Sequence, residues 1–376
     1  MLYIHTPFCK TRCIYCDFYS TTRATAPVIA RYVRAARAEM QSRATELGGR
    51  PLGSIYIGGG TPSLLPPEAV AELIGEARGT FTIRPDAEIT LEANPDDITP
   101  AYARAIREAG INRMSLGVQS LHDTTLRFLR RRHTADEARQ AVLCLREAGF
   151  RNISIDLIFG LPGQSGADWQ ADLTAAFALP IAHLSAYALS IEPGTPMARL
   201  VSEHRAQAAD EGTYADDYAL LLDAAAAHGF EHYEISNFAL PGHASRHNSG
   251  YWDGRPYVGI GPGACSFDGH STRRTNRPDL AAYLAAPPGH APHDTEHLTP
   301  DERFNEAVFT ALRTRRGLDT LALCHHFPAA WTDALLAAAA RQMAAGTLTE
   351  SPDHRLRLTR RGLFVSDDVM SDLMRV

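Results

Sequence analysis

The chain lacks the features that mark membrane, secreted or nucleic-acid-binding proteins. No apolar run in its 376 residues approaches the roughly 20 residues that a membrane-spanning helix needs. Met1 leads directly into an apolar segment (2–6), without a basic stretch and apolar leader. The formal net charge of −6 gives no support for a nucleic-acid-binding surface. We therefore expect a cytoplasmic protein with no integral membrane segment and no nucleic-acid partner.

Cysteine is scarce and unevenly placed. The chain has six cysteines, and three of them lie within CKTRCIYC, residues 9 to 16. A chain of this size can bury roughly 75% of the surface that its unfolded form exposes, so it needs no disulfide bonds for stability. Thiols also stay reduced in the cytosol. Three clustered cysteines in such a compartment indicate a metal site or catalysis.

The rest of the chain alternates strand-length apolar runs with helical patterns. AIREAGINRMSLGVQ (105–119) and CLREAGFRNISIDLIFG (144–160) share a helix end, a glycine and an apolar strand, and a third copy places Gly229 in the same role. In each copy the glycine can end a helix. This alternation predicts βαβ units and a parallel sheet, in a full or partial (β/α) barrel. The active site of such a barrel lies at the carboxyl ends of its strands.

The pattern changes near residue 240. We expect a βα barrel over 1–240, a glycine-rich extension over 241–285 and a C-terminal domain over 286–376. The Pro/His/Gly-rich stretch 286–297 is interpreted as a linker. Helices at 301–315 and 329–345, followed by a hairpin at 346–359, predict a small winged-helix-like domain. Such domains often bind DNA, but the acidic composition favours a packing or lid role.

Cys9, Cys13 and Cys16 follow the spacing C-x3-C-x2-C directly after the first predicted strand. Iron–sulfur clusters are normally held by four thiolates, so three would leave one iron with an open position. The alternatives are a zinc site completed by a distant histidine, or three unrelated thiols. No metal-binding role is assigned to the other cysteines, Cys144, Cys265 and Cys324.

With this motif the chain resembles the radical S-adenosylmethionine (SAM) superfamily, in which an aromatic residue, here Tyr15, precedes the third cysteine. The resemblance implies an α/β fold with a partial (β/α)6 TIM-like barrel. It implies one [4Fe–4S] cluster on Cys9, Cys13 and Cys16, with SAM on the open iron. In the superfamily, one electron from the cluster cleaves SAM to a 5′-deoxyadenosyl radical.

Later blocks resemble one subgroup, the oxygen-independent coproporphyrinogen oxidases and the related HemW-type haem chaperones. The matching blocks are YIHTPFCKTRCIYCDF (3–18), IYIGGGTPS (55–63), LEANPDD (91–97), MSLGVQS (114–120), LRRRHT (129–134), IDLIFGLPGQ (155–164) and IGPGACSF (260–267). A solvated position within RRRH is the alternative for Arg131. By motif position, the resemblance implies SAM contacts at Tyr3, Tyr15, Gly59, Gly60, Thr61, Glu92, Gln119, Arg131 and Asp156.

Two features separate the chaperones from the oxidases. The oxidases carry a fourth cysteine two residues after the third, where this chain has Phe18. RHNSGYW (246–252) resembles the H-N-x-x-Y-W motif of the chaperones. That resemblance implies that His247 binds haem iron while Tyr251 and Trp252 stack on the porphyrin. The alternative for His247 is a loop histidine without a role.

The resemblance thus implies a haem chaperone that binds haem, a [4Fe–4S] cluster and SAM, and transfers haem to an acceptor haemoprotein. Coproporphyrinogen oxidase activity is expected to be absent. Three alternatives stay open: the oxidase itself, a radical SAM enzyme with another substrate, and a zinc-stabilised binding module.

Overall fold

The computed structural model of the chain describes residues 1–375. Its main sheet has nine strands in the order β7-β8-β6-β5-β4-β3-β2-β1-β9. The strands β1 to β6 are mutually parallel and run in sequence order across the sheet. Their bounds are β1 (Leu2–Thr6), β2 (Leu52–Gly59), β3 (Ile83–Ala93), β4 (Arg113–Gln119), β5 (Asn152–Phe159) and β6 (His183–Ala188).

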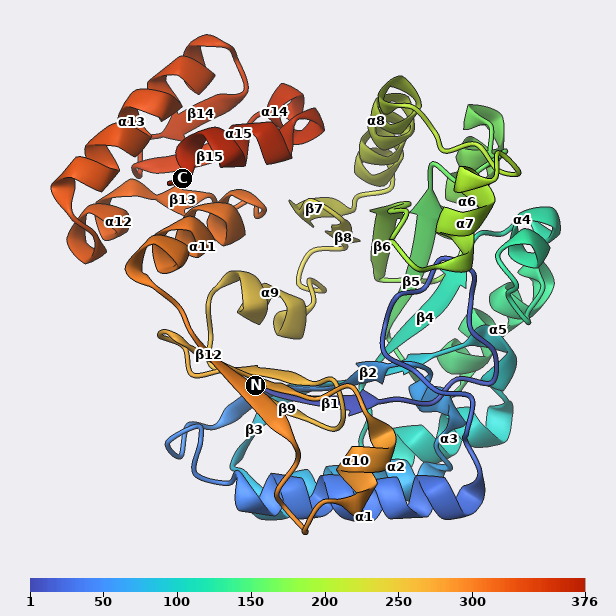
Figure 1. Ribbon diagram of the computed structural model, residues 1–376. Helices are drawn as coiled ribbons and strands as arrows, with labels where there is room; N and C mark the ends of the chain where they lie inside the picture. Colours follow the sequence, from blue (N-terminus) through green and yellow to red (C-terminus); the bar gives the residue numbers. More distant parts are fainter. Residues whose placement is uncertain (376) are drawn as a thin grey trace.

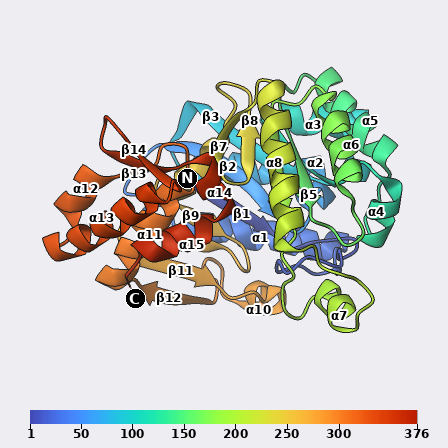
Figure 2. The same ribbon diagram turned by 90° about the horizontal axis from the view of Figure 1, so that it is seen from above.

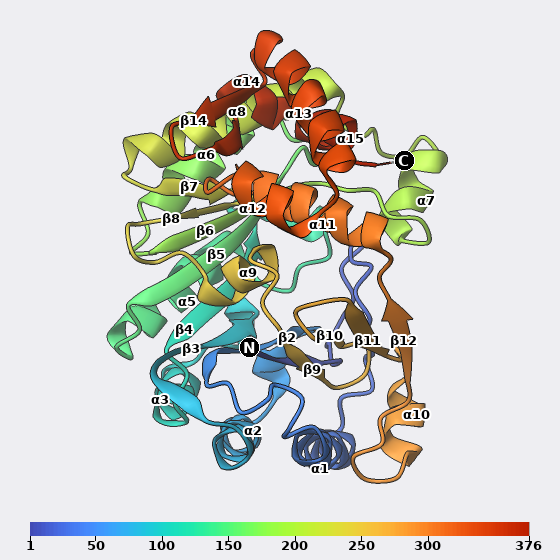
Figure 3. The same cartoon turned by 90° about the vertical axis from the view of Figure 1, so that its left-hand side faces the viewer.

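Helices cover the convex face of this curved sheet, so the predicted partial (β/α)6 barrel is confirmed (Figures 1 and 3). The helices that follow successive strands are α1 (Ala26–Ser42), α2 (Pro67–Thr80), α3 (Pro100–Glu108), α4 (Asp123–Phe128), α5 (Ala135–Glu147), α6 (Gly166–Phe177), α7 (Pro196–Ser202) and α8 (Glu211–Ala227). Short 3-10 helices, η1 (Pro62–Leu64) and η2 (Pro95–Asp97), follow β2 and β3. No helix within residues 1–375 is long and apolar enough to cross a membrane.

Side-chain alternation along the strands separates the core from the barrel interior. On β3, Ile89 and Leu91 are buried in the main hydrophobic core beneath the helices. Successive strand residues point to opposite faces, so Thr90 and Glu92 point to the concave side. Polar residues therefore line the inside of the barrel, where a ligand can use them.

The predicted helix-ending glycines lie where the repeat placed them. Gly110 and Gly149 follow α3 and α5 with φ of 105° and 93°, in the left-handed region that glycine favours. Gly229 follows α8 in the same way, with φ of 76°. The strand after it differs: β7 (Glu231–Glu234) pairs antiparallel with β8 (Asn237–Ala239), and β8 pairs antiparallel with β6.

The glycine-rich extension returns to the first edge of the barrel. Its helix α9 (Arg246–Trp252) lies on the concave side and contacts β2 (Figure 3). Its strand β9 (Val258–Ile260) pairs in parallel with β1. A small antiparallel sheet follows, made of β10 (Cys265–Phe267), β11 (Thr272–Asn276) and β12 (His293–His297), with α10 (Leu280–Ala285) between the last two.

The prediction of a linker over 286–297 is wrong in its second half. Residues 293–297 form β12, which pairs with β11 although all five of its side chains are exposed. Polar edge strands gain stability from backbone pairing, which side-chain patterns do not reveal. The small sheet thus joins residues on both sides of position 286, and the three-part division of the chain stays a prediction.

The C-terminal residues have a hydrophobic core of their own, around Phe304, Leu335, Leu356 and Met370. The predicted helices and hairpin are confirmed as α11, α13 and the β14–β15 pair. These elements gather on one side of the barrel (Figure 2). Their bounds are α11 (Pro300–Leu312), β13 (Leu318–Asp319), α12 (Thr320–His326), α13 (Ala329–Ala344), β14 (Leu348–Ser351), β15 (Arg355–Leu358), α14 (Arg360–Phe364) and α15 (Ser366–Leu373).

Candidate functional site

The three clustered cysteines line one cavity of about 470 Å³ at the carboxyl ends of the barrel strands. They lie on the loop between β1 and α1. Ile14, inside the motif, is buried in a small apolar cluster with Leu129 and Ile158. Its backbone N–H donates to the Leu129 carbonyl at 3.4 Å, and its carbonyl accepts from Met197 N–H at 2.9 Å. These contacts hold the loop in place, and its three thiols line the cavity.

The three thiols do not converge on one metal-ion position, and hydrogen-bond donors lie beside two of them. Within residues 1–375, no three His, Cys, Asp or Glu side chains converge on one metal-ion position. A closed zinc site takes four ligands around one ion, whereas an iron–sulfur cluster holds its thiolates on separate irons. Thr61 Oγ1 lies 3.5 Å from Cys9 Sγ, and Arg131 Nη1 lies 3.3 Å from Cys13 Sγ. Burial raises the pKa of the Cys16 thiol.

Glu92 lies at the end of β3 on the wall of this cavity. Its Oε1 accepts the Tyr56 hydroxyl at 2.7 Å, and its Oε2 accepts the Gly59 N–H at 3.0 Å. Burial raises its pKa to about 7, since these two bonds and Arg113 only partly offset the loss of water. Each oxygen keeps a lone pair, so Glu92 can accept hydrogen bonds from a ligand with hydroxyl groups.

Asp156 is another acid of the cavity, near the middle of β5. Burial raises its pKa to about 6, and hydrogen bonds from Ser185 and Ser115 oppose that rise. The Ser115 hydroxyl lies 3.3 Å from Asp156 Oδ1. Two carboxyl groups with raised pKa values in one cavity are typical of a ligand site.

Arg131 connects the cysteine loop to the strand ends. It follows α4 and, besides Cys13, donates from Nη2 to Asn94 Oδ1 at 2.6 Å and to the Gly117 carbonyl. Its buried Nε has no hydrogen-bond partner within residues 1–375. The solvated alternative for Arg131 is therefore wrong, and the unpaired donor suits an anionic group of a ligand.

Backbone geometry at two strand ends keeps the cavity open. Gly60 allows close approach to the cysteine loop, because a Cβ there would lie 2.6 Å from the Phe8 carbonyl oxygen and 3.1 Å from Cys9 Sγ. Gln119, at the end of β4, has φ of 73°, which is rare for a residue with a side chain. The β4–β5 register shifts at the same point, between Gly117 and Gln119. Such outliers concentrate at functional sites.

The structure brings most of the sequence-predicted residues together. Tyr3 is the exception, because it lines a second cavity, where its hydroxyl lies 3.0 Å from His5 Nδ1. Eight of the nine positions proposed for SAM line the same cavity as the cysteines: Tyr15, Gly59, Gly60, Thr61, Glu92, Gln119, Arg131 and Asp156.

Sequence reasoning missed the residues that hold these groups in place. Tyr56 supports Glu92, Asn94 supports Arg131 and Ser115 supports Asp156. The available signal is the period of two along a strand. Asn94 lies two residues after Glu92, and Ser115 lies four residues before Gln119, so each shares an inward face with a predicted residue.

The predicted haem residues lie apart from the cysteines. His247 is buried on α9, where Nδ1 lies 2.9 Å from the Ser54 hydroxyl and Nε2 lies 3.0 Å from the Tyr251 hydroxyl. Burial lowers its pKa to about 3. Tyr251 and Trp252, by contrast, line the second cavity, which measures about 850 Å³. Both ring nitrogens of His247 therefore have hydrogen-bond partners, while Tyr251 and Trp252 line the second cavity.

Comparison with known proteins agrees with this arrangement. Residues 3–176 match the radical SAM superfamily, and residues 298–365 match the HemN C-terminal domain. The fold is similar to coproporphyrinogen III oxidase (HemN) from Escherichia coli, with a TM-score of 0.85. That match covers 99% of this chain and 89% of the other at 22% identity, so it shows the fold alone.

Sequence relatives are more specific. The heme chaperone HemW of Mycobacterium tuberculosis is 38% identical, over 99% of this chain and 94% of the relative. HemW of Bacillus subtilis is 34% identical over 98% and 97%, and HemW of Escherichia coli is 37% identical over 70% and 68%. The chain therefore belongs to the radical SAM superfamily and, within it, to the HemW family.

Proposed function

We propose that this protein is a haem chaperone that binds haem and transfers it to an acceptor haemoprotein. The observation that carries the proposal is the similarity, over nearly the whole chain, to relatives that are named heme chaperones. The cysteine cavity supports a radical SAM scaffold beneath that function, since it combines three thiols with acidic and basic groups.

Cys9, Cys13 and Cys16 would hold a [4Fe–4S] cluster, with Arg131 and Thr61 donating to the sulfur atoms. When bound, the cluster would supply one electron at low potential. Hydrogen bonds to cluster sulfurs tune that potential, so Arg131 and Thr61 would also set how readily the electron leaves.

The other cavity residues suit SAM. Glu92 and Asp156 would accept hydrogen bonds from the ribose hydroxyls, and the unpaired Nε of Arg131 would donate to the carboxylate. The glycine turn at Gly59 and Gly60 would admit the methionine end close to the backbone.

Phe18 bears on the choice between chaperone and oxidase. It stands where the oxidases have a fourth cysteine, its surface is 65% exposed, and it lines both the cysteine cavity and the second cavity. An exposed aromatic ring provides a contact surface for a flat apolar ligand and carries no thiol chemistry. We therefore propose that the protein does not oxidise coproporphyrinogen III.

The test uses the full chain, reconstituted anaerobically with iron, sulfide and SAM. We expect it to bind haem in a stable complex and to pass that haem to apomyoglobin, used as a model acceptor. Adding a reductant and coproporphyrinogen III should give no protoporphyrinogen IX. Absence of haem binding would overturn the chaperone proposal, and formation of protoporphyrinogen IX would restore the oxidase.

Arg131→Lys tests the SAM assignment. Lysine keeps the charge but loses the planar fork that reaches Asn94, Cys13 and the ligand together. We expect SAM affinity to fall about tenfold, equivalent to about 1.4 kcal/mol, while cluster absorption persists. Equilibrium SAM binding by the anaerobic protein measures this. Arg127→Lys, at an exposed position of α4 outside the cavity, is the matched control and should bind SAM normally.

A further inference from the structure

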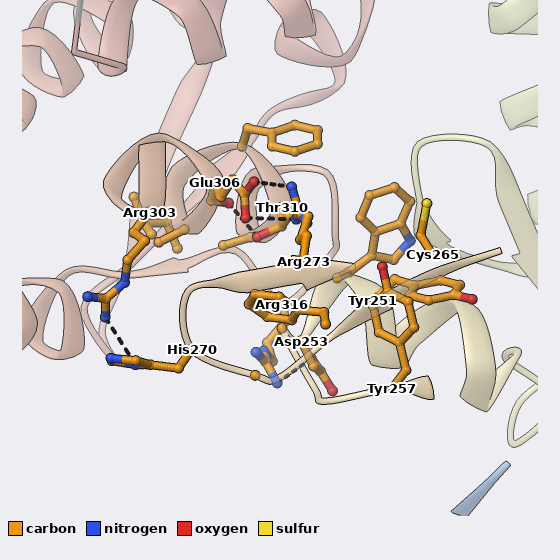
Figure 4. Close-up of a pocket in the computed structure, with 18 of the residues that line it drawn as sticks. Tyr251, Asp253, Tyr257, Cys265, His270, Arg273, Arg303, Glu306, Thr310 and Arg316 are labelled. Carbon is orange, nitrogen blue, oxygen red and sulfur yellow. Dashed lines mark hydrogen bonds and ion pairs between the residues drawn. The ribbon is translucent and has the colours of Figure 1, made fainter. Parts of the chain in front are cut away.

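The second cavity lies between the glycine-rich extension and the C-terminal helices. It measures about 850 Å³, within the usual range of roughly 300–1,000 Å³ for small-molecule sites. Tyr251 enters it from α9, Tyr257 from the position before β9, Cys265 from β10 and Arg303 from α11 (Figure 4). Trp252 of α9 also lines it. It is large enough, and aromatic enough, for a flat macrocycle.

The cavity has an aromatic, thiol-bearing end and a basic end. Figure 4 shows Cys265, Tyr251 and Tyr257 grouped together, while His270 and Arg303 lie at the opposite side. The rings of Tyr251 and Tyr257 pack edge to face, with centroids 4.8 Å apart. Trp252 Nε1 is buried without a hydrogen-bond partner within residues 1–375. The aromatic rings at this end therefore suit a flat apolar ligand.

Cys265 is a suitable iron ligand at the aromatic end. It is exposed on β10, and within residues 1–375 the only hydrogen-bond contact of its Sγ is a long one to the Thr275 hydroxyl, at 3.5 Å. Pairing of β10 with β11 fixes its position. Cys thiolate is an established ligand of haem iron. His247, with both nitrogens bonded to neighbouring side chains, would first have to break one of those bonds.

The basic end suits carboxylates. Arg273, Arg316 and Arg355, which also line the cavity, are paired with Glu306, Asp253 and Asp319. Within residues 1–375, Arg303 makes no ion pair, and the only hydrogen-bond contact of its side chain is to His270 Nδ1 at 3.5 Å. A free arginine at the rim of an apolar cavity is a ready partner for a propionate.

We propose that haem occupies this cavity with the Cys265 thiolate on its iron and a propionate on Arg303. The proposal rests on the haem-binding function proposed above and specifies its site. When haem enters, the Cys265 thiol loses its proton to solvent and an iron–sulfur bond replaces an iron–water bond, with no change in oxidation state. Tyr251 and Trp252 then contribute to haem binding through the cavity wall, and His247 by positioning Tyr251.

The first test is spectroscopic and uses the full chain with ferric haem, in a buffer free of small thiols. Electron paramagnetic resonance should show the narrow g anisotropy of thiolate-ligated iron. Cys265→Ser should abolish that signature and weaken haem binding at least about tenfold. Cys324→Ser, which changes an exposed cysteine outside the cavity, is the matched control and should leave both unchanged.

The second test fills the cavity without touching the proposed ligand. Ala322 is an exposed residue of α12 that lines the cavity, so Ala322→Trp should weaken haem binding at least about tenfold while the protein stays folded. Ala337→Trp, at an exposed position of α13 outside the cavity, should bind haem normally. Circular dichroism checks the folding of both variants.

The outcomes separate the two proposals. If the unmodified chain binds no haem, the chaperone function itself fails. If it binds haem but Cys265→Ser keeps the full affinity and the same spectrum, the proposed ligand is wrong while the function stands. An imidazole-type spectrum that His326→Ala or His247→Ala abolishes would likewise overturn Cys265 and assign the iron to that histidine.

Discussion

Replacing Cys9, Cys13 or Cys16 by alanine is expected to abolish the absorption of a reconstituted [4Fe–4S] cluster. The three thiols line one cavity, and the other cysteines do not line it: Cys144 lies on α5, Cys265 on β10 and Cys324 on α12. A cluster that has only three protein thiolates cannot spare one, because two would leave two irons without protein ligands. Iron and acid-labile sulfide should fall with the absorption.

The controls use the remaining thiols. Cys144→Ala, Cys265→Ala and Cys324→Ala should each reconstitute a normal cluster under the same anaerobic conditions. Full cluster absorption in Cys13→Ala would contradict the ligand assignment, and with it the radical SAM chemistry proposed for the site. Zinc retention with no visible absorption in the unmodified chain would instead support the zinc alternative.

The sequence was sufficient for the barrel because each element carries a local signal. Short apolar runs that form strands alternate along the sequence with segments that have helical periodicity. Gly110 and Gly149 mark helix ends through a backbone conformation that few other residues adopt. The cysteine motif is also local, since its three thiols lie within one loop. Such features can be predicted from neighbouring residues alone.

Features that depend on distant residues were not predictable in this way. The exposed strand β12 has no apolar alternation and is held by its pairing with β11. The sequence motif predicts that His247 binds haem iron, but its Nδ1 lies within hydrogen-bond distance of Ser54, a residue of β2 far away in the chain. Tyr3 follows a family position, yet its side chain lines the second cavity. Tertiary contacts decide each of these cases.

Glu92→Gln is expected to change both SAM binding and its dependence on pH. The carboxyl has a pKa of about 7 in the folded protein, against 4.5 ordinarily, because burial disfavours its charge. The charged groups that face it are Asp156 and Arg113. A raised folded pKa means that stability is greatest below the ordinary pKa and is lost as pH rises toward about 7. Because the Glu92 residue is partly exposed at the cavity wall, we expect the loss to be about 2 kcal/mol.

The affinity for SAM should depend on pH in the opposite direction to the free energy of unfolding. Ribose hydroxyls donate better to a carboxylate than to a carboxylic acid, so SAM affinity of the cluster-loaded protein should rise as pH increases through about 7. SAM should also release protons as it binds near that pH. Isothermal titration in buffers of different ionisation enthalpy measures this release directly.

Glu92→Gln should remove the contribution of this carboxyl to both pH effects. Its unfolding free energy should fall less between about pH 5 and about pH 8 than that of the unmodified chain, and the fall that remains includes the contribution of Asp156. Its SAM affinity at the higher pH should be about a hundredfold lower, because two hydrogen bonds to a charged group become bonds to a neutral amide. Asp156→Asn is the companion variant. Because the carboxyl of Asp156 has a pKa of about 6, we expect a similar effect at lower pH. If Glu92→Gln bound SAM normally while losing the pH dependence of stability, Glu92 would be a buried acid of the barrel interior, and the ribose hydroxyls would need another acceptor.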